Sequence, residues 1–314
     1  MGKFKILATE GLSPFAIESL RPAADLICFN SPSTFWKDQL PSIDGLIIRT
    51  RTQITEEILS TSPQLRWIAR AGNGLDNLDL EACTLKGVEV WSTPDASTES
   101  TAEHTCLLIL MLARHSSQFL FSLRESRWRN GVELATELSG KNLGLIGCGR
   151  IGRRVAHRMK AFGMNVMAYD PFVHKNEFAD LQIRSAELEE LLKHADFISL
   201  HLPLKSDTRN FLNEERLAQC KASAFVINAA RGGLVDESAL LKLLNTGHLS
   251  GVALDVFENE PTLASDPLVN HPRVLTSPHM GARSTEAQER IDRRITEKVL
   301  EYISSTKNGR VNEL

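Results

Sequence analysis

Residues 140–171 read GKNLGLIGCGRIGRRVAHRMKAFGMNVMAYDP. An apolar run, LGLI, leads into the glycine motif GCGRIG at 147–152, and an amphipathic helical pattern follows the motif. A second apolar run, VMAY, then ends at Asp170. A strand, a glycine-rich turn, a helix and a second strand with an acidic end are typical of the first half of a doubly wound parallel sheet. The stretch therefore predicts an α/β fold of the Rossmann type.

Each residue of this motif has a physical reason to be there if the turn binds a dinucleotide. Gly147 permits the tight turn, Gly149 lets the backbone approach a pyrophosphate, and Gly152 lets helix and strand pack closely. The helix N-terminus offers free N–H groups and a positive dipole to the phosphates. Asp170 can accept hydrogen bonds from the ribose hydroxyls and would repel a 2′-phosphate, so we expect NAD rather than NADP.

Strand and helix patterns alternate along the whole chain, which favours α/β architecture throughout. Residues 100–124 form an apolar helical pattern that predicts a helix buried on several faces, in the protein core or against a second subunit. A last helix, about 285–304, follows the completed sheet and is expected to return to the first domain. We expect a discontinuous substrate-binding domain, 1–98 with 285–314, and an NAD-binding domain, 99–284. Eleven strands are expected, at 6–8, 26–29, 45–49, 65–70, 88–91, 143–147, 165–170, 197–202, 224–228, 252–257 and 274–277.

The composition is that of a globular protein, with 42% apolar residues, 24% charged residues and a net charge of -3. This charge gives no support to binding of nucleic acid or of an anionic membrane surface. The five cysteines lack metal-ligand and redox spacing, so we predict no metal and a reducing compartment, the cytoplasm. The longest apolar run, 106–113, is too short to span a bilayer.

Three polar segments follow three predicted strands, and each should emerge at the carboxyl edge of the same sheet, where open α/β folds bind ligands. NAARGG contains Arg231, LDVFENEP contains Glu260, and SPHMGA contains His279. Oxidation of a hydroxy acid needs a cation for the carboxylate and a base for the hydroxyl proton. We expect Arg231 to bind the carboxylate, His279 to exchange the proton, and Glu260 to orient the imidazole and stabilise its charged form.

Other residues compete for these roles. His201 also ends a strand and is the main rival to His279, but no acidic residue closely follows it. Glu258 and Asp255 are rivals to Glu260. We expect Asp255 to lie nearer the nicotinamide and Glu258 to be solvated.

From about residue 70 to 281 the chain resembles the D-isomer-specific 2-hydroxyacid dehydrogenases, and within them the phosphoglycerate dehydrogenases. The matching motifs are RAGNGLDNLDL, STAEHT, GLIGCGRIGRRVA, AYDP, HLPL, NAARGGLVDESALL, GVALDVFENEP and SPHMGA. The resemblance implies a Rossmann domain, a smaller flavodoxin-like substrate domain, and the roles given above for Arg231, Glu260 and His279. It implies cofactor contacts at Arg150, Ile151, Asp170, Leu202, Ala229, Ala230, Asp255 and Gly281.

The substrate should be recognised by the other domain. Arg49 and Arg51 lie two apart at the end of one strand, and Arg70 ends the next strand. The glycine-rich turn after Arg70 includes Asn73 and Gly74, whose backbone N–H groups could bind an anion. At Asn73 the sequence departs from the family, where a small hydroxyl residue is common. Three arginines near one turn suit a phosphate rather than lactate or glycolate.

These features lead to a prediction of function. The resemblance implies NAD-dependent oxidation of D-3-phosphoglycerate to 3-phosphohydroxypyruvate, in serine biosynthesis. The apolar helix after Ser100 has too many apolar residues for one buried face, so we expect it to lie in a homodimer interface. The alternatives are a glyoxylate or hydroxypyruvate reductase on the same scaffold, and a corepressor-like NAD-sensing binding protein. The chain ends at Leu314, where longer members of the family continue into regulatory domains, so we expect no feedback inhibition through such a domain.

Overall fold

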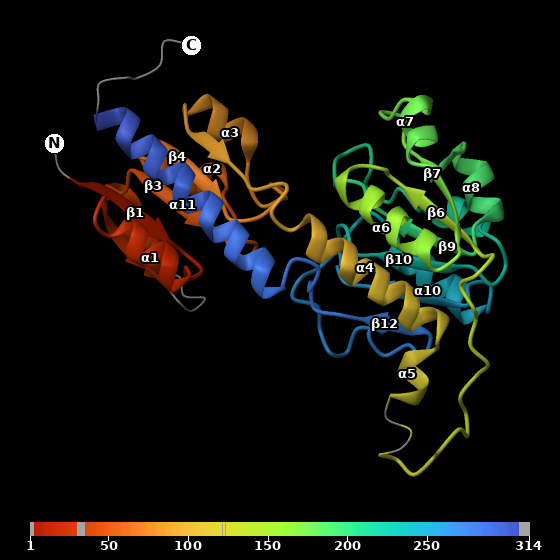
Figure 1. Ribbon diagram of the computed structural model, residues 1–314. Coiled ribbons are helices and arrows are strands. Elements are labelled where there is room, and N and C mark those ends of the chain that lie inside the picture. Colours follow the sequence, from red (N-terminus) through yellow and green to blue (C-terminus); the bar gives the residue numbers. More distant parts are fainter. Residues whose placement is uncertain (1–2, 30–34, 121, 123, 308–314) are drawn as a thin grey trace. The chain divides into compact units, whose positions relative to one another are not determined.

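The computed structural model describes residues 3–29, 35–120, 122 and 124–307 of the chain (Figure 1). The chain divides into two compact units. The first unit joins Met1–Ser97 to Ser284–Leu314, and the second is the continuous stretch Thr98–Arg283. Each unit is built around its own parallel β-sheet, and each is described by itself.

The first unit has a five-stranded parallel sheet with the order β2-β1-β3-β4-β5, which is the flavodoxin-like order. Apolar clusters cover both faces of this sheet, as the continuous apolar strands require. The C-terminal helix α11 packs on α1 and β4, so the last helix completes the core of this unit. The elements are β1 (Phe4–Ala8), α1 (Pro14–Leu20), β2 (Ala24–Cys28), the 3₁₀ helix η1 (Phe35–Ser42), β3 (Gly45–Ile48), α2 (Glu56–Ser60), β4 (Trp67–Arg70), α3 (Leu80–Leu85), β5 (Glu89–Trp91) and α11 (Thr285–Lys307).

The second unit has a seven-stranded parallel sheet with the order β12-β11-β10-β9-β6-β7-β8. Its apolar clusters also lie on both faces of the sheet. The elements are α4 (Thr98–Ala113), α5 (Ser116–Phe119), β6 (Asn142–Ile146), α6 (Arg150–Ala161), β7 (Asn165–Tyr169), α7 (Lys175–Asp180), β8 (Arg184–Ser185), α8 (Leu188–His194), β9 (Phe197–Leu200), α9 (Glu214–Ala218), β10 (Phe225–Asn228), α10 (Glu237–Asn245), β11 (Gly251–Leu254) and β12 (Val274–Thr276). The two sheets confirm the predicted fold class.

The prediction missed the edge strand β8 of the second sheet. This strand has two residues, Arg184 and Ser185, which pair with Met167 and Ala168 of β7. Two residues are too few to produce an alternating or apolar pattern, so periodicity could not identify the strand.

Pairing places the ends of the strands of the second sheet side by side. The last residues of β10, β11 and β12 are direct partners, since Asn228 pairs with Leu254 and Leu254 pairs with Thr276. The last residue of β6, Ile146, pairs in the same way with Tyr169 of β7 and with Leu200 of β9. The loops that follow these strands therefore leave the sheet at one edge.

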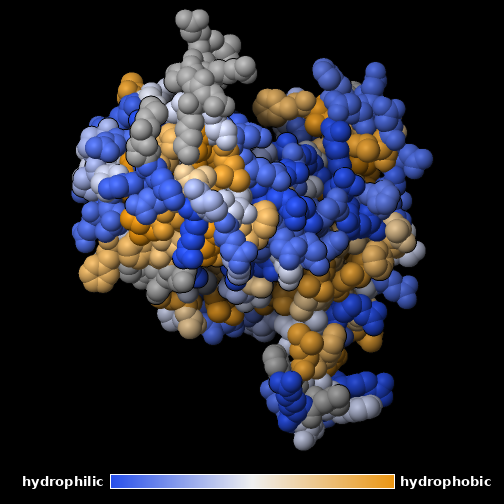
Figure 2. All heavy atoms as spheres, turned by 60° about the vertical axis from the view of Figure 1, so that its left-hand side comes forward, coloured by the Kyte–Doolittle hydropathy of each residue, from blue (hydrophilic) through white to orange (hydrophobic). Residues whose placement is uncertain are grey.

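The predicted long helix is shorter than expected. It ends at Ala113, and His115 adopts the left-handed conformation with φ 50 before the short helix α5. The helix packs against α6 and against strands β10 to β12, which accounts for its buried apolar residues. After α5 the chain extends away from the rest of the second unit (Figure 1). Exposed apolar side chains lie on α4, on α5 and on this extension (Figure 2), namely Leu107, Phe119, Leu120, Trp128 and Leu134.

Within the described residues, no helix combines the length and the apolar character that a membrane span requires.

Candidate active site

The glycine turn after β6 is tightly packed at both ends and open in its middle. Gly147 has φ +94, and a Cβ there would lie 2.7 Å from the backbone oxygen of His201. A Cβ on Gly152 would lie 2.6 Å from the oxygen of Gly147. In contrast, a Cβ on Gly149 would meet no atom within 4 Å. The two outer glycines thus serve chain packing, whereas the middle one faces open space at the N-terminus of α6, where a phosphate can approach.

Asp170 directly follows β7 and is held by the turn that it faces. Its Oδ2 accepts a hydrogen bond from the backbone N–H of Cys148 at 2.8 Å, and its Oδ1 accepts one from Phe172 N–H at 3.0 Å. Each carboxylate oxygen has a further lone pair, so a ribose hydroxyl could still be bound. Cys148 itself is buried, and desolvation raises the pKa of its thiol to about 11, which makes this cysteine unreactive at neutral pH.

The other predicted cofactor residues lie at the same edge of the sheet. Arg150 and Ile151 begin α6, Leu202 follows β9, and Ala229 and Ala230 follow β10. The Leu202 side chain lies 3.2 Å from the position of a Cβ on Gly147. The open turn, the helix N-terminus and the acidic residue after the second strand together fit a dinucleotide.

His279 and Glu260 form a direct pair. The Nδ1 atom of His279 lies 2.7 Å from Oε2 of Glu260, and the two side chains are 34% and 30% exposed. Glu260 Oε1 accepts a hydrogen bond from the backbone N–H of Phe257 at 3.1 Å, which fixes the carboxylate on its own loop. Because a carboxylate only accepts, Nδ1 carries a proton, and Nε2 of a neutral ring is left with a lone pair. A pair arranged in this way could act as a partly exposed general base.

Arg231 lies in a turn that contacts the Glu260 loop. Asn228 shapes this turn, because its amide donates to the oxygen of Arg231 at 2.8 Å and accepts from Ala230 N–H at 3.1 Å. A Cβ on the next residue, Gly232, would lie 1.8 Å from the oxygen of Phe257, so backbone packs on backbone there. The turn that carries Arg231 and the loop that carries Glu260 are thus neighbours. Neither Asn228 nor Gly232 was predicted, although an Asn that ends a strand is a common turn signal.

Asp255 is the buried carboxylate of the site. It directly follows β11, is 1% exposed, and accepts hydrogen bonds from the backbone N–H groups of Met280 and Gly281 at 2.7 and 2.9 Å. Desolvation raises the pKa of Asp255, but hydrogen bonds from His104, Ser277 and Met280 outweigh this effect and lower it overall. Asp255 thus stays charged and holds the turn of His279. Sequence reasoning placed Asp255 near the cofactor and overlooked His104 and Ser277.

The geometry favours His279 over His201 as the base. The His201 Nε2 atom lies 3.0 Å from the hydroxyl of Ser199, and no carboxylate of the described residues forms a hydrogen bond with its ring. Desolvation lowers the pKa of His201 to about 4. Glu258, which was expected to be solvated, forms an exposed ion pair with Arg209 at 3.1 Å.

The predicted substrate residues lie in the first unit, at or just after the carboxyl ends of β3 and β4. Arg49 donates to Gln288 at 2.8 Å and forms an ion pair with the buried carboxylate of Asp292. Arg70 is 8% exposed and donates to Ala71 and Thr50. Arg51 is exposed to solvent. The turn after Arg70 contains Asn73 and Gly74, both partly exposed.

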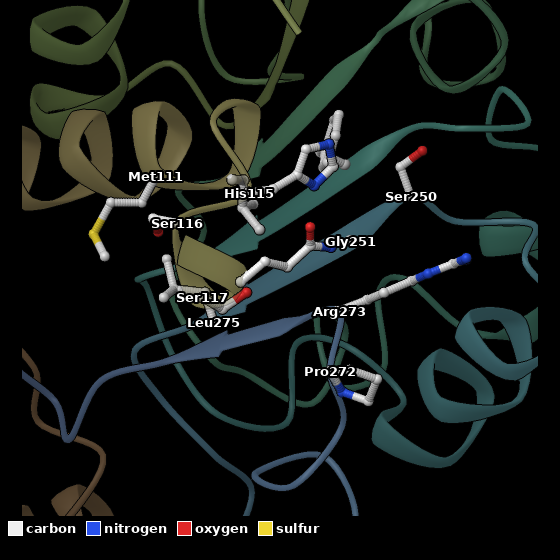
Figure 3. Close-up of a pocket in the computed structure, with 12 residues that line it drawn as sticks. Met111, His115, Ser116, Ser117, Ser250, Gly251, Pro272, Arg273 and Leu275 are labelled. Carbon is white, nitrogen blue, oxygen red and sulfur yellow. The ribbon is translucent and has the colours of Figure 1, made fainter. Parts of the chain in front are cut away.

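A separate pocket opens at the opposite edge of the second sheet (Figure 3). Its lining includes His115, Gly251 and Arg273, and the last two lie at the amino ends of β11 and β12. This pocket is therefore remote from the carboxyl edge that carries Arg231, Glu260 and His279. It has no part in the site described above.

Comparison with known proteins decides the family. The family model for the NAD binding domain of D-isomer specific 2-hydroxyacid dehydrogenases matches residues 106–281. The chain belongs to this family. The match confirms the resemblance seen in the sequence and the predicted NAD cofactor.

Individual relatives agree with the family assignment. The chain is 38% identical over 299 residues to D-3-phosphoglycerate dehydrogenase of Bacillus subtilis, covering 95% of the chain and 57% of the relative. It spans about half the length of the curated relatives that it matches.

Two solved structures have the same fold. D-lactate dehydrogenase from Aquifex aeolicus, solved with NAD and lactic acid, is 32% identical with a TM-score of 0.87, over 96% of this chain and 95% of that one. A glyoxylate reductase from Paecilomyes thermophila is 29% identical with a TM-score of 0.88, over 96% of each chain.

We predict that Gly149→Ala weakens NADH binding and leaves folding intact. The added methyl group meets no protein atom, but it projects where the pyrophosphate must approach. The dissociation constant for NADH, measured by fluorescence titration, should rise at least tenfold, and the melting temperature should stay within about 1 °C, since the free protein loses no contact. A variant that binds NADH normally would show that the cofactor does not approach this turn.

We predict that His201 stays neutral down to about pH 4, because desolvation lowers the pKa of its ring to about 4. The unfolded chain binds a proton near the reference pKa of roughly 6.5, and the folded protein does not until a lower pH. The contribution of His201 to the free energy of unfolding is therefore constant above that reference value and falls as the pH decreases toward 4. NMR titration of the ring signals checks this, and a ring that becomes charged near pH 6.5 would contradict it.

Proposed function

We propose that the protein oxidises D-3-phosphoglycerate to 3-phosphohydroxypyruvate with NAD. The observation that carries the proposal is the His279–Glu260 pair, held at 2.7 Å on a loop at the edge of the sheet where the glycine turn also lies. The similarity to D-3-phosphoglycerate dehydrogenases supports the choice of substrate. The same reaction can run in reverse, because the imidazole can return the proton that it takes.

In this proposal, Arg231, His279 and Glu260 of the second unit each have a separate role in the reaction. Arg231 presents a planar guanidinium that can bind the carboxylate of the hydroxy acid and polarise the reacting oxygen. The Nε2 lone pair of His279 takes the hydroxyl proton as hydride leaves the neighbouring carbon. Glu260 then stabilises the imidazolium across its short contact with Nδ1. When bound, NAD supplies the hydride acceptor that no side chain provides.

The phosphate group is assigned to the arginines of the first unit, which differ in their surroundings. Arg49 already neutralises Asp292, whose side chain is 4% exposed, so its role in binding is secondary to its role in the fold. Arg51 is solvent-exposed, and its backbone N–H donates to the carboxylate of Glu10 at 3.3 Å. We therefore assign the phosphate contact first to Arg51 and Arg70. Asn73 and Gly74 remain candidates through their backbone N–H groups.

The second candidate is a glyoxylate or hydroxypyruvate reductase. The similarity to a solved glyoxylate reductase over almost the whole of both chains favours it. The His279–Glu260 pair serves either reaction, so only the recognition of a phosphate separates the two functions.

The exposed apolar side chains on α4 and the extension after α5 support a homodimer. Trp128 is 67% exposed and Leu134 is 96% exposed, and soluble monomers rarely leave so many large apolar groups together in solvent. We propose that a second copy of the chain covers them.

The first prediction of this proposal concerns the proton. His279→Ala should lower turnover at least a hundredfold and leave NADH binding unchanged, because the glycine turn is untouched. Glu260→Gln should keep part of the activity, since an amide can still accept from Nδ1. His201→Asn is the matched control and should keep most of the turnover. Steady-state kinetics decide, and an active His279→Ala with an inactive His201→Asn would reverse the two roles.

The second prediction concerns the substrate. In a panel of 2-hydroxy and 2-oxo acids with NAD(H) and NADP(H), phosphoglycerate with NAD should give the highest kcat/KM. Arg51→Ala should lower kcat/KM for phosphoglycerate by roughly ten- to a hundredfold, the value of one charge-assisted contact, and leave glycerate unaffected. Arg49→Ala should instead lower the free energy of unfolding by about 1.5–3 kcal/mol. Equal losses on both substrates for Arg51→Ala would favour the reductase.

The third prediction concerns assembly. Light scattering should give twice the chain mass of 34.9 kDa. Trp128→Glu combined with Leu134→Glu should shift the protein toward the monomer by burying charge in the interface. A wild-type monomer at micromolar concentration would exclude the homodimer.

A further inference from the structure

The motif STAEHT at residues 100–105 has no part in the chemistry proposed above, yet it contacts the turn that carries the catalytic histidine. The motif forms the first turns of α4, and the turn in question, Ser277–Gly281, follows β12. Ser100 Oγ donates to the backbone oxygen of Gly281 at 2.7 Å. A Cβ on Gly281 would lie 3.3 Å from the methyl group of Thr101, so helix and turn are closely packed.

His104 is the residue of this motif that contacts the carboxylate of Asp255. Its Nε2 atom lies 3.1 Å from Oδ1 of Asp255 and 3.1 Å from Oγ of Ser277, and its side chain is 15% exposed. Ser277 Oγ donates to the same carboxylate oxygen at 2.6 Å. Since Asp255 only accepts, Nε2 of His104 must carry a proton. The imidazole of His104 thus links α4 to Asp255, the residue after β11, and to Ser277 at the start of the turn.

The turn needs such support because of its backbone conformation. His279 has φ 55, a left-handed value that is unfavourable for a residue with a Cβ. Its backbone N–H donates to the oxygen of Asp255 at 2.8 Å, and the next two N–H groups donate to the carboxylate of Asp255. The position of the carboxylate therefore sets the position of the His279 ring.

We propose that His104 is a positioning residue for His279: through Asp255 and Ser277 it fixes the turn that holds the imidazole against Glu260. This proposal rests on the proposed role of His279 as the proton acceptor. The hydrogen bonds of the His104 ring go to the carboxylate of Asp255 and the hydroxyl of Ser277, and it acts through these two groups. Its effect should be larger on turnover and on the mobility of the turn than on cofactor affinity.

The experiment combines kinetics with hydrogen exchange of the full chain. His104→Leu keeps the bulk of the ring and removes the donor, and it should lower kcat about tenfold, with KM for both substrates changed less than twofold. Exchange at the Met280 and Gly281 amides, followed by mass spectrometry without ligand, should become at least tenfold faster, because both amides bind Asp255. His104→Gln offers an N–H at a similar place and should restore both properties at least in part.

Two further variants keep the test decisive. Ser277→Ala should resemble His104→Leu, and the double variant should lose less than the product of the two single losses, because both act on one carboxylate. Glu103→Gln, on the exposed face of the same helix, is the control and should change neither readout. Unchanged exchange at the turn in both His104→Leu and Ser277→Ala overturns the proposal. Failure of the proposed function shows separately, as full turnover in His279→Ala.

Discussion

Parallel strand pairing in register is the constraint on which the rest of the second unit depends. Because Asn228, Leu254 and Thr276 are direct partners, the chain leaves three neighbouring strands at one level. The segments that follow carry Arg231, Glu260 and His279, and none of them is longer than six residues between strand end and side chain. Short connections from a rigid edge give little freedom to loops, so the sheet itself limits where these three side chains can lie.

The two carboxylates after β11, Asp255 and Glu260, differ in function because their surroundings differ. Asp255 is buried and accepts hydrogen bonds from the hydroxyl of Ser277 and the backbone N–H of Gly281, so its charge stabilises the turn. Glu260 is 30% exposed and shares its charge with an imidazole that reaches solvent. A buried carboxylate that accepts several hydrogen bonds holds its donors, and is held by them, in one position. A half-exposed one can take part in a reaction in which its partner gains and loses a proton.

The arginines of the first unit show how far residue type alone can guide assignment. Arg49 and Arg51 are indistinguishable in sequence, two apart at the end of a strand. The fold gives Arg49 a buried carboxylate on α11, which is more than two hundred residues away along the chain. Among the described residues, no carboxylate forms such an ion pair with the guanidinium of Arg51, which is exposed. A long-range ion pair of this kind leaves no local pattern, so the distinction could come only from the tertiary structure.

The sequence by itself determined the architecture, because apolar strands, amphipathic helices and the glycine turn are local patterns whose periods can be counted. It also determined that Gly147–Gly152, Asp170, Arg231, Glu260 and His279 follow strand ends of one sheet. Tertiary structure decided what depends on contact across the chain: the pairing of Glu260 rather than Glu258 with His279, the isolation of His201 from any carboxylate, and the link from His104 to Asp255. Hydrogen bonds between residues 151 positions apart have no period, and only packing brings their partners together.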